Sequence, residues 1–380
     1  MATKLSNDPR LAINGGPKAR TIVSPGAPKF DIAELMEIVE LWGVPKEKQQ
    51  QIRAILSEPG AARSPHLFRY YGPQGAGKVQ QLEREFAAFM GAPHALAVNS
   101  GTSALIAALV ACGIGPGMEV LVPAHTFFAS AAAIVVAKAI PVLVEIDESM
   151  TMDVEDAARK ITPQTRAILP VHMRGMACNM DGLMALAQRQ NLRVVEDCAQ
   201  ADGGLYKGKR LGTLGDCGCF SFDFYKLMAT GEGGMVTSQD ERIHVRAQSY
   251  HDTAACWRPD RYARERMPGE LFCGENYRMS EVHGAMGLAQ LRKLDGIIRG
   301  RLAAKKWIRS GIASTSAVRL GQDHDPDGGA GNLVFIAKDR DTALAAIEAL
   351  KHEGVSAGGL FNNEVRDWHV YTHWEHILEQ

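Results

Sequence analysis

The sequence predicts an α/β protein with a largely parallel central sheet that is covered by helices on both faces. From Ala95 onward, short apolar runs of strand length alternate with turn residues and helical segments. Buried parallel strands are typically apolar throughout, and helices cover both faces of such sheets. With 380 residues, 46% of them hydrophobic, the chain can bury a large core and divide into a major and a minor domain. The runs are ALAVN, EVLVPA, IPVLVEI, AILPVHM, LRVVEDCA and GCFSF.

A helical arm is predicted ahead of this region. Residues 31–56 have the periodicity of one or two amphipathic helices, split at Gly43 to Pro45. A polar, glycine-bearing stretch then leads to a further helical pattern at Val79 to Met90. We expect residues 1–94 to form this arm and to lead into the large domain.

A smaller α/β domain is predicted after the large domain, which we place at residues 95–279. Residues 280–299 have the pattern of a long helix that leads out of the large domain. Beyond it, LVFIAKD predicts a strand and DTALAAIEALKHEGVS predicts a helix. We therefore assign residues 280–380 to a linking helix and a small domain.

Composition excludes several classes of function. The formal net charge of −1 and a pI near 6.9 give no basic surface for nucleic acid. Residues 1–20 lack the apolar core of a signal peptide, and no run of eighteen apolar residues could cross a bilayer. We expect a cytoplasmic protein that acts on small molecules and has no membrane partner.

The cysteines predict neither a disulfide framework nor a metal site. There are seven of them, scattered and odd in number, which fits reduced thiols in a core. Cys217 and Cys219 lack the paired CxxC spacing of a zinc site.

The first candidate for chemistry is the turn NSGTSAL at Asn99 to Leu105, which follows a predicted strand and opens an alanine-rich helix. Free backbone N–H groups, the helix dipole and several hydroxyls together suit a phosphate dianion. Ser100 or Thr102 could equally serve only as the N-cap of the helix. Both interpretations stay open from the turn alone.

The second candidate is Asp197, an acid at the end of the apolar strand in LRVVEDCAQADGG. A carboxylate there is costly to bury without a partner, which points to a cationic or proton-bearing ligand such as a protonated pyridine nitrogen. Acids at this edge of parallel sheets also cap turns or bind metals and ribose. Gln200, three residues on, could contact a second polar atom of the same ligand.

The third candidate is Lys226, which follows an aromatic strand and precedes a glycine-rich return in GCFSFDFYKLMATGEGGMV. Held among Phe220, Phe222, Phe224 and Tyr225, a lysine would lose proton affinity through desolvation. The neutral amine could then attack an aldehyde. A surface lysine after a strand is the alternative.

The three features together identify a family. They occur in the order phosphate turn, strand-end acid and lysine, and the chain resembles the DegT/DnrJ/EryC1/StrS sugar aminotransferases, within the fold type I aspartate aminotransferase superfamily. The resemblance begins at about Ile13, in INGGPKAR, and is densest between Asn99 and Arg292. It implies a pyridoxal 5′-phosphate enzyme with a mostly parallel seven-stranded sheet flanked by helices and a smaller C-terminal α/β domain.

The resemblance assigns five residues to the phosphate of the cofactor. The SGTxAL turn of the family is matched from Ser100 onward, and Ser221 in FSF resembles another phosphate contact. The motif GENYRMSEVHGAMGLAQL matches a segment whose asparagine reaches the phosphate of the neighbouring subunit, which implies a homodimer with shared active sites. The five residues are Gly101, Thr102, Ser103, Ser221 and Asn276.

Four further residues are assigned to the ring and the reactive carbon. Phe127, after VPAHT, matches the aromatic residue stacked on the pyridine face. Asp197 in EDCAQA matches the acid at the pyridine nitrogen, and Gln200 the residue near the ring hydroxyl. Lys226, before TGEGGM, stands at the Schiff-base position and is, with Asp197, the expected catalytic residue.

The chain departs from the family pattern in two places. Many relatives have tyrosine where this chain has Arg174 in His172-Met-Arg-Gly, which alters the pocket but not the cofactor set. The sequence also stops soon after VYTHWEHILEQ, so that the small domain is expected to be short. The dehydratase branch has histidine at the lysine position, and Lys226 makes that branch an unlikely match.

The resemblance implies a ping-pong transfer of an amino group from L-glutamate or L-glutamine to a keto sugar. The acceptor is a nucleotide-linked sugar or a keto-cyclitol such as an inosose, as in amino-sugar and antibiotic biosynthesis. Two alternatives stay open: an enzyme of the same fold that acts on a non-sugar substrate, and a cofactor-binding regulator without turnover. A nicotinamide dehydrogenase is excluded, because no GxGxxG follows the first strand.

Overall fold

The computed structural model describes residues 8–18, 29–70, 77–271, 273–312, 318–359 and 366–379. The chain divides into two compact units, residues 1–66 and 67–380, which are described separately. In the described residues, no helix is long and apolar enough to cross a membrane.

The first unit holds a 3-10 helix, η1 (Ala12–Asn14), and the two helices α1 (Ile32–Glu40) and α2 (Lys46–Leu56). The predicted split between α1 and α2 is confirmed, and Gly43 lies there with a positive φ of 65°. Asp31 caps α1, and Glu34 completes a capping box by accepting a hydrogen bond from the Asp31 backbone.

The second unit is built on a sheet of seven strands, which confirms the predicted fold class. The spatial order is β1-β9-β8-β5-β4-β2-β3, and β8, β5, β4, β2 and β3 pair in parallel. β9 lies between β1 and β8 and is antiparallel to both, so that β1 runs in the same direction as the parallel strands. The strands are β1 (His94–Val98), β2 (Glu119–Pro123), β3 (Ile140–Val144), β4 (Thr165–Ile168), β5 (Arg193–Asp197), β8 (Cys217–Ser221) and β9 (Gly234–Ser238).

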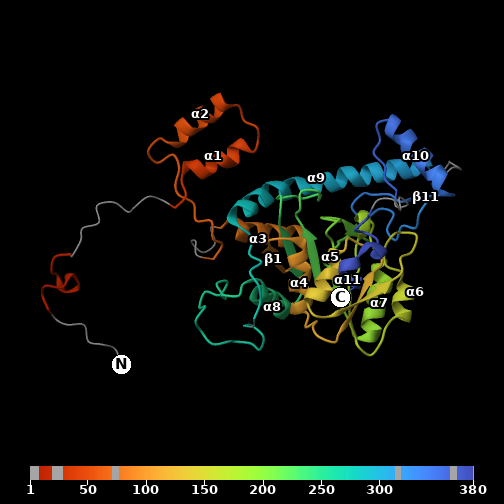
Figure 1. Cartoon of the computed structure of the whole chain (residues 1–380), viewed down its shortest axis with the longest axis horizontal. Helices are drawn as coiled ribbons and strands as arrows, with labels where there is room; N and C mark the ends of the chain where they lie inside the picture. The colour runs from red at the N-terminus through yellow and green to blue at the C-terminus, as the bar shows by residue number, and fades with distance from the viewer. Residues whose placement is uncertain are drawn as a thin grey trace. The chain divides into compact units, whose positions relative to one another are not determined.

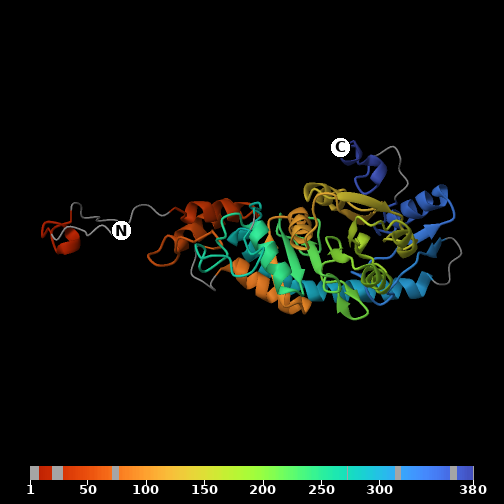
Figure 2. The ribbon, with the colours of Figure 1, turned by 90° about the horizontal axis from the view of Figure 1, so that it is seen from below.

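Helices cover both faces of the sheet, and each face has its own buried cluster. One cluster takes apolar side chains from α3, α7 and α9, and Figure 2 shows the long α9 along that side of the strands. The other cluster lies under α4, α5 and α8. The helices are α3 (Lys78–Met90), α4 (Gly101–Ala111), α5 (Ala129–Val136), α6 (Val154–Arg159), α7 (Met180–Gln190), α8 (Glu241–His251) and α9 (Glu281–Ile312).

After the sheet, α9 runs thirteen residues beyond the predicted end at 299 and leads to a small α/β element. The hairpin β10 (Val318–Leu320) and β11 (Phe335–Ala337) precedes α10 (Arg340–His352), so the predicted strand and helix are both present. In Figure 1, α10 and β11 lie near one end of α9.

The C-terminal segment, residues 366–379, returns to the large sheet. It contains η3 (Tyr371–His373) and α11 (Glu375–Leu378), and Trp374 is fully buried in the cluster under α5. Figure 1 shows α11 beside α5. The segment therefore belongs to the wall of the large domain.

Candidate active site

All of the predicted ring and phosphate residues except Asn276 follow the carboxyl ends of strands that run in the same direction. Gly101 follows β1, Phe127 follows β2, Gln200 follows β5 and Lys226 follows β8. Carboxyl ends of parallel strands meet at one edge, where α/β sheets commonly bind ligands. We call this group of residues the strand-end cluster.

The turn before α4 forms a tight cradle. Ser100 is the N-cap of α4, and its Oγ accepts a hydrogen bond from Ser103 N at 3.0 Å. A Cβ on Gly101 would lie 2.6 Å from Ser221 Cβ, and one on Gly234 would collide with Ser100 O. Only glycine therefore allows the turn to lie this close to Ser221, which places both predicted phosphate segments side by side. Thr102 occupies the first turn of α4 between them.

Asp197 ends β5 and is buried among neutral donors. Its Oδ2 accepts from Ser130 Oγ at 2.7 Å, and its Oδ1 accepts from Ala199 N at 3.0 Å. Burial raises the pKa of Asp197, while these donors and the nearby Lys226 act in the opposite direction. Thr126 extends this series of hydrogen bonds, because its Oγ1 lies 2.8 Å from Ser130 Oγ. Ser130, in α5, and Thr126, just before α5, carried no sequence signal, since isolated small polar residues rarely indicate a site.

Lys226 lies on the turn between β8 and β9, and its backbone N–H donates to Asp223 O at 2.9 Å. The prediction that four aromatic side chains enclose Lys226 is wrong. Phe220 and Phe222 are buried in the core, but Phe224 and Tyr225 are 73% and 89% exposed. Alternation along the strand directs the first pair inward, and the turn that follows carries the second pair out to solvent.

Asp202 is a buried acid near Lys226 that the sequence analysis missed. Its Oδ2 accepts from Met228 N at 3.4 Å, whereas its Oδ1 has no partner among the described residues. Burial raises the pKa of Asp202 well above its usual range, and Lys226 opposes that shift. An unsatisfied buried oxygen beside a lysine marks a polar position that a ligand or the lysine itself can fill.

The C-terminal segment adds His369 to the cluster. Phe128 N donates to Trp368 O at 3.0 Å, and Tyr371 N donates to Ala124 O at 3.1 Å, so the segment is tied to the residues on both sides of Phe127. The ring of His369 lies 5.5 Å from that of Phe127, which is 40% exposed.

A carboxylate holds this histidine in place. Asp367 Oδ1 lies 2.8 Å from His369 Nδ1. Burial lowers the pKa of His369, and the charges of Arg174 and Lys226 act in the same direction. Neither residue could be found from the sequence, because they are more than 140 positions from Lys226.

Gln200 is anchored to the turn that carries Arg174. Gln200 Oε1 accepts from Arg174 N at 2.9 Å, and Arg174 has a left-handed φ of 53°. Beneath them, His172 Nε2 lies 3.1 Å from Glu196 Oε2 in the core. A third potential metal ligand, Cys198, lies within 4.8 Å of both. Backbone N–H groups of residues 212, 214 and 215 donate to Glu196, so that this carboxylate fixes a loop.

Asn276 lies beside the phosphate turn of its own chain. The next residue, Tyr277, accepts a hydrogen bond from Asn99 N at 2.8 Å, and Arg278 forms a bridge with Val98. Asn276 itself is exposed, and its Oδ1 accepts from Arg278 N at 3.4 Å. Its side chain is thus accessible both to its own turn and to a second copy.

These observations fit pyridoxal phosphate. The cradle that a Cβ at position 101 would fill, at the positive end of α4, suits the phosphate. Buried Asp197, held by neutral donors only, suits a protonated ring nitrogen. Among the charged groups that lower the pKa of Asp197, Lys226 has the largest effect.

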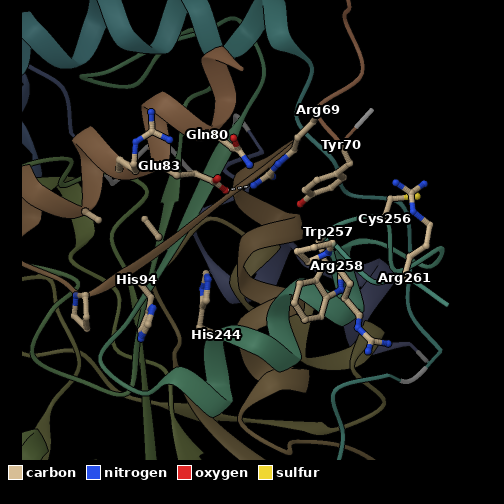
Figure 3. Close-up of a pocket in the computed structure, with 15 residues that line it drawn as sticks. Arg69, Tyr70, Gln80, Glu83, His94, His244, Cys256, Trp257, Arg258 and Arg261 are labelled. Atoms are coloured by element: carbon tan, nitrogen blue, oxygen red, sulfur yellow. Dashed lines mark hydrogen bonds and ion pairs between the residues drawn. The ribbon is translucent and has the colours of Figure 1, made fainter. Parts of the chain in front are cut away.

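A cavity of about 520 Å³ lies away from this cluster, between α3, β1, α8 and the segment after α8. Its lining includes Arg69, Arg258 and Trp257, which Figure 3 shows as sticks. None of the nine residues predicted for the cofactor is among its lining residues.

The chain is similar in sequence to proteins of known activity. A model of the DegT/DnrJ/EryC1/StrS aminotransferase family matches residues 73–379. The GDP-perosamine synthase of Caulobacter vibrioides is 41% identical over 241 residues, 62% of this chain and 62% of that protein. The L-glutamine:2-deoxy-scyllo-inosose aminotransferase of Streptoalloteichus tenebrarius is 37% identical over 221 residues, 57% of this chain and 52% of that protein.

A solved structure shares the fold along most of the chain. The X-ray structure of the aminotransferase from Psychrobacter cryohalolentis has a TM-score of 0.67 and 30% identity, and the match covers 88% of this chain and 83% of that one. The chain spans only 52–62% of the length of the two curated relatives.

Proposed function

The chain belongs to the DegT/DnrJ/EryC1/StrS aminotransferase family, and on this premise we propose that it is a pyridoxal-phosphate-dependent aminotransferase. The amino donor is L-glutamate or L-glutamine, and the acceptor is a keto sugar or a keto-cyclitol. The names of the two curated relatives support this acceptor class, since one concerns a nucleotide-linked sugar and the other an inosose.

The juxtaposition of Asp197 and Lys226 carries the proposal. Asp197 ends β5, and Lys226 lies on the turn that follows the neighbouring strand β8. The two residues are close enough for Lys226 to lower the pKa of Asp197. A carboxylate and an amine so placed can serve the two ends of one ring, the ring nitrogen and the reactive carbon. When bound, pyridoxal phosphate supplies an electron sink and carries the amino group between donor and acceptor.

Each residue of the site has a separate role toward the cofactor. Asp197, oriented by Ser130 Oγ and Ala199 N, holds a proton at the ring nitrogen. Lys226 Nζ attaches the cofactor and moves the proton at the substrate carbon. Phe127 covers a ring face, and Gln200, anchored by Arg174 N, meets the ring hydroxyl.

The phosphate is assigned to the cradle at the start of α4. Gly101, Thr102 and Ser103 offer backbone N–H groups and hydroxyls there, and Ser221 lies against Gly101. Asn276 is proposed to reach the same cradle of a second copy, which makes the enzyme a homodimer with two shared sites.

Visible spectra of the cofactor-loaded protein test the proposal. We expect the absorbance of the bound cofactor to bleach on addition of L-glutamate or L-glutamine and not of the D-enantiomers. Keto sugars and keto-cyclitols, added after removal of the donor, should restore the absorbance. A simple 2-keto acid other than the one formed from the donor tests the non-sugar alternative, because the donor's own keto acid restores the absorbance by reversal of the first half-reaction. Stable cofactor binding without bleaching by any donor would instead indicate a regulator without turnover.

A further inference from the structure

The cavity beside β1 has the size of a small-molecule site. It measures about 520 Å³, within the range of about 300–1,000 Å³ usual for ligand pockets. His94 and Ala95 line it at the amino end of β1, whereas the phosphate turn follows the carboxyl end of that strand. The cavity is therefore separate from the strand-end cluster. We call it the arginine pocket, after Arg69, Arg84, Arg258 and Arg261.

The lining of the arginine pocket is rich in positive charge. It contains four arginines, and Glu83 is the only acid among the fifteen lining residues. Glu83 is already committed, because it pairs with Arg69 and its Oε1 accepts from Ala97 N at 2.7 Å. Two acids outside the lining, Asp260 and Glu270, lie 3.7 and 3.6 Å from Arg258. The four arginines outnumber the single acid of the lining, so the walls of the cavity carry net positive charge.

Two stacked histidines, His94 and His244, also line the arginine pocket. The rings of His94 and His244 lie 4.7 Å apart at an angle of 16°. Burial lowers the pKa of His244 to about 3, and His94 and Arg69 act in the same direction. His244 is therefore neutral near pH 7 and adds no positive charge, so that the charge of the lining comes from its arginines and Glu83.

Three buried N–H donors at the cavity have no acceptor within the described residues. They are Arg69 Nε, Arg258 Nε and Trp257 Nε1. The remaining donors of Arg69 are occupied by Glu83 and by Ala97 O at 2.8 Å. Those of Arg258 are occupied by backbone carbonyls at 3.0 and 3.1 Å. Arg258 Nε faces Glu270 Oε1 at 3.6 Å, just beyond hydrogen-bond distance. Buried donors are almost always satisfied in folded proteins, so Arg69 Nε and Trp257 Nε1 indicate a missing acceptor at this cavity.

Two aromatic side chains give the pocket flat apolar surface. In Figure 3, the rings of Tyr70 and Trp257 lie between Arg69 above and Arg258 below. The guanidinium of Arg69 lies 4.7 Å from the centre of the Tyr70 ring, and the Tyr70 hydroxyl is fixed by His251 Nε2 at 2.7 Å. A planar group could therefore stack in the pocket while an anionic group meets the arginines.

We propose that the arginine pocket binds a small molecule in which a phosphoryl group is joined to a planar ring. Guanidinium groups match the geometry and charge of a phosphoryl group and bind it through two parallel hydrogen bonds. The volume of the cavity exceeds what a free phosphate ion needs, and the aromatic side chains in its lining suit a planar ring in the remaining space. Such a site lies outside the reaction centre and does not depend on the proposed transamination.

Calorimetric titration of the cofactor-loaded protein tests this site, because the bound cofactor blocks the phosphate cradle at α4. The probes are adenosine 5′-monophosphate, inorganic phosphate and adenosine. We expect the nucleotide to bind more tightly than either of its parts. Arg84→Ala and Arg261→Ala should each weaken the nucleotide about tenfold, which is the usual loss for one charged hydrogen bond.

Matched variants separate this effect from general loss of charge or fold. Arg189→Ala removes an exposed helical arginine from α7 and should leave nucleotide affinity unchanged. Arg84 is also an exposed helical residue, so its loss should preserve the fold, and circular dichroism checks this. Equal affinity in the wild type and the Arg84→Ala/Arg261→Ala double variant would overturn the proposal, as would equal affinity for nucleotide and adenosine. Amino transfer by the double variant is measured in parallel. If the double variant still transfers the amino group, the arginine pocket and the proposed aminotransferase activity are independent, and each proposal is tested by its own experiment.

Discussion

Asp197 at the end of β5 and Arg69 beside β1 are both buried charged residues, yet their surroundings differ. Asp197 accepts hydrogen bonds from a hydroxyl and an amide, with Lys226 nearby. Arg69 donates to Glu83 and Ala97 but keeps one buried donor without an acceptor. The end of β5 is thus suited to a cation or a proton, and the arginine pocket to an anion. The same sheet therefore presents two sites of opposite electrostatic character.

The largest expected effect is confined to the strand-end cluster. Lys226→Ala should lower amino transfer by about 10⁴-fold, because the attachment point and the group that moves the proton are both lost. Borohydride reduction should no longer fix the cofactor to the chain, as mass spectrometry can show. Nucleotide binding in the arginine pocket should be unchanged. Lys209→Ala, at an exposed lysine of β7 (Lys209–Arg210), is the control, and full turnover in the Lys226 variant would end the proposal.

Replacement of the buried acid should have the next largest effect. Asp197→Asn should lower the turnover rate by about 10²-fold, because the neutral amide no longer stabilises a proton on the ring nitrogen. Ser130→Ala leaves the carboxylate in place but removes its 2.7 Å hydrogen bond from Ser130 Oγ, together with the contact between Ser130 Oγ and Thr126 Oγ1, and should cost about tenfold. Stopped-flow absorbance with excess donor measures both. Wild-type rates in the asparagine variant would show that Asp197 is not the ring partner.

The two regions each contain a histidine whose burial makes the fold sensitive to acid. Burial lowers the pKa of His125, near His369, to about 4 and that of His244, in the arginine pocket, to about 3. Below pH 6.5 the unfolded chain takes up protons that the folded chain does not, so stability falls as the pH decreases from 6.5 toward 4. Each pKa unit corresponds to about 1.4 kcal/mol, which gives up to about 3 kcal/mol for His125.

Urea unfolding at pH 7 and pH 4.5 measures this loss. His125→Gln and His244→Gln should each make the unfolding free energy less dependent on pH, and the two reductions should add because the sites are separate. An unchanged difference between the two pH values in either variant would show that the histidine is protonated in the folded state.

Substitution of His369 tests whether this residue belongs to the strand-end cluster. His369→Asn should lower kcat/KM about tenfold, because its ring contacts Phe127 and lies near Lys226. Asp367→Asn should move the same parameter in the same direction, since Asp367 fixes the ring through Nδ1. His376→Asn, on α11 and against Phe128, is the matched control. Equal losses in the His369 and His376 variants would mean that only packing of the C-terminal segment matters.

The smallest effect concerns sharing of the cluster between subunits. A Lys226→Ala chain mixed with an Asn276→Ala chain should form dimers in which one site carries both lesions and the other neither. With equal mixing, half of the dimers are mixed, so about a quarter of wild-type activity should return. If Asn276 serves its own turn, each site keeps one lesion and no activity returns. Mass spectrometry under native conditions verifies that mixed dimers are present.

Local patterns determined much of the fold. Apolar runs of strand length gave six of the seven strands of the large sheet, and glycine and proline placed the break between α1 and α2. The seventh, β9, was hidden in a glycine-rich return, because GGMVTS contains few of the residues that favour strands. The antiparallel pairing of β9 with β1 and β8 depends on the topology of the whole sheet, and local sequence patterns do not predict it.

The sequence by itself determined that Asp197, Lys226 and the turn at Ser100 follow strand ends, because strand boundaries and turn residues are encoded within a few positions. Only the tertiary structure decided which distant groups join them. It brought His369 to Phe127, placed Ser130 on Asp197 and exposed Tyr225 where an enclosure was expected. It also left three buried donors around the arginine pocket. The physical reason is that such contacts join segments far apart in the chain, and packing rather than periodicity selects them.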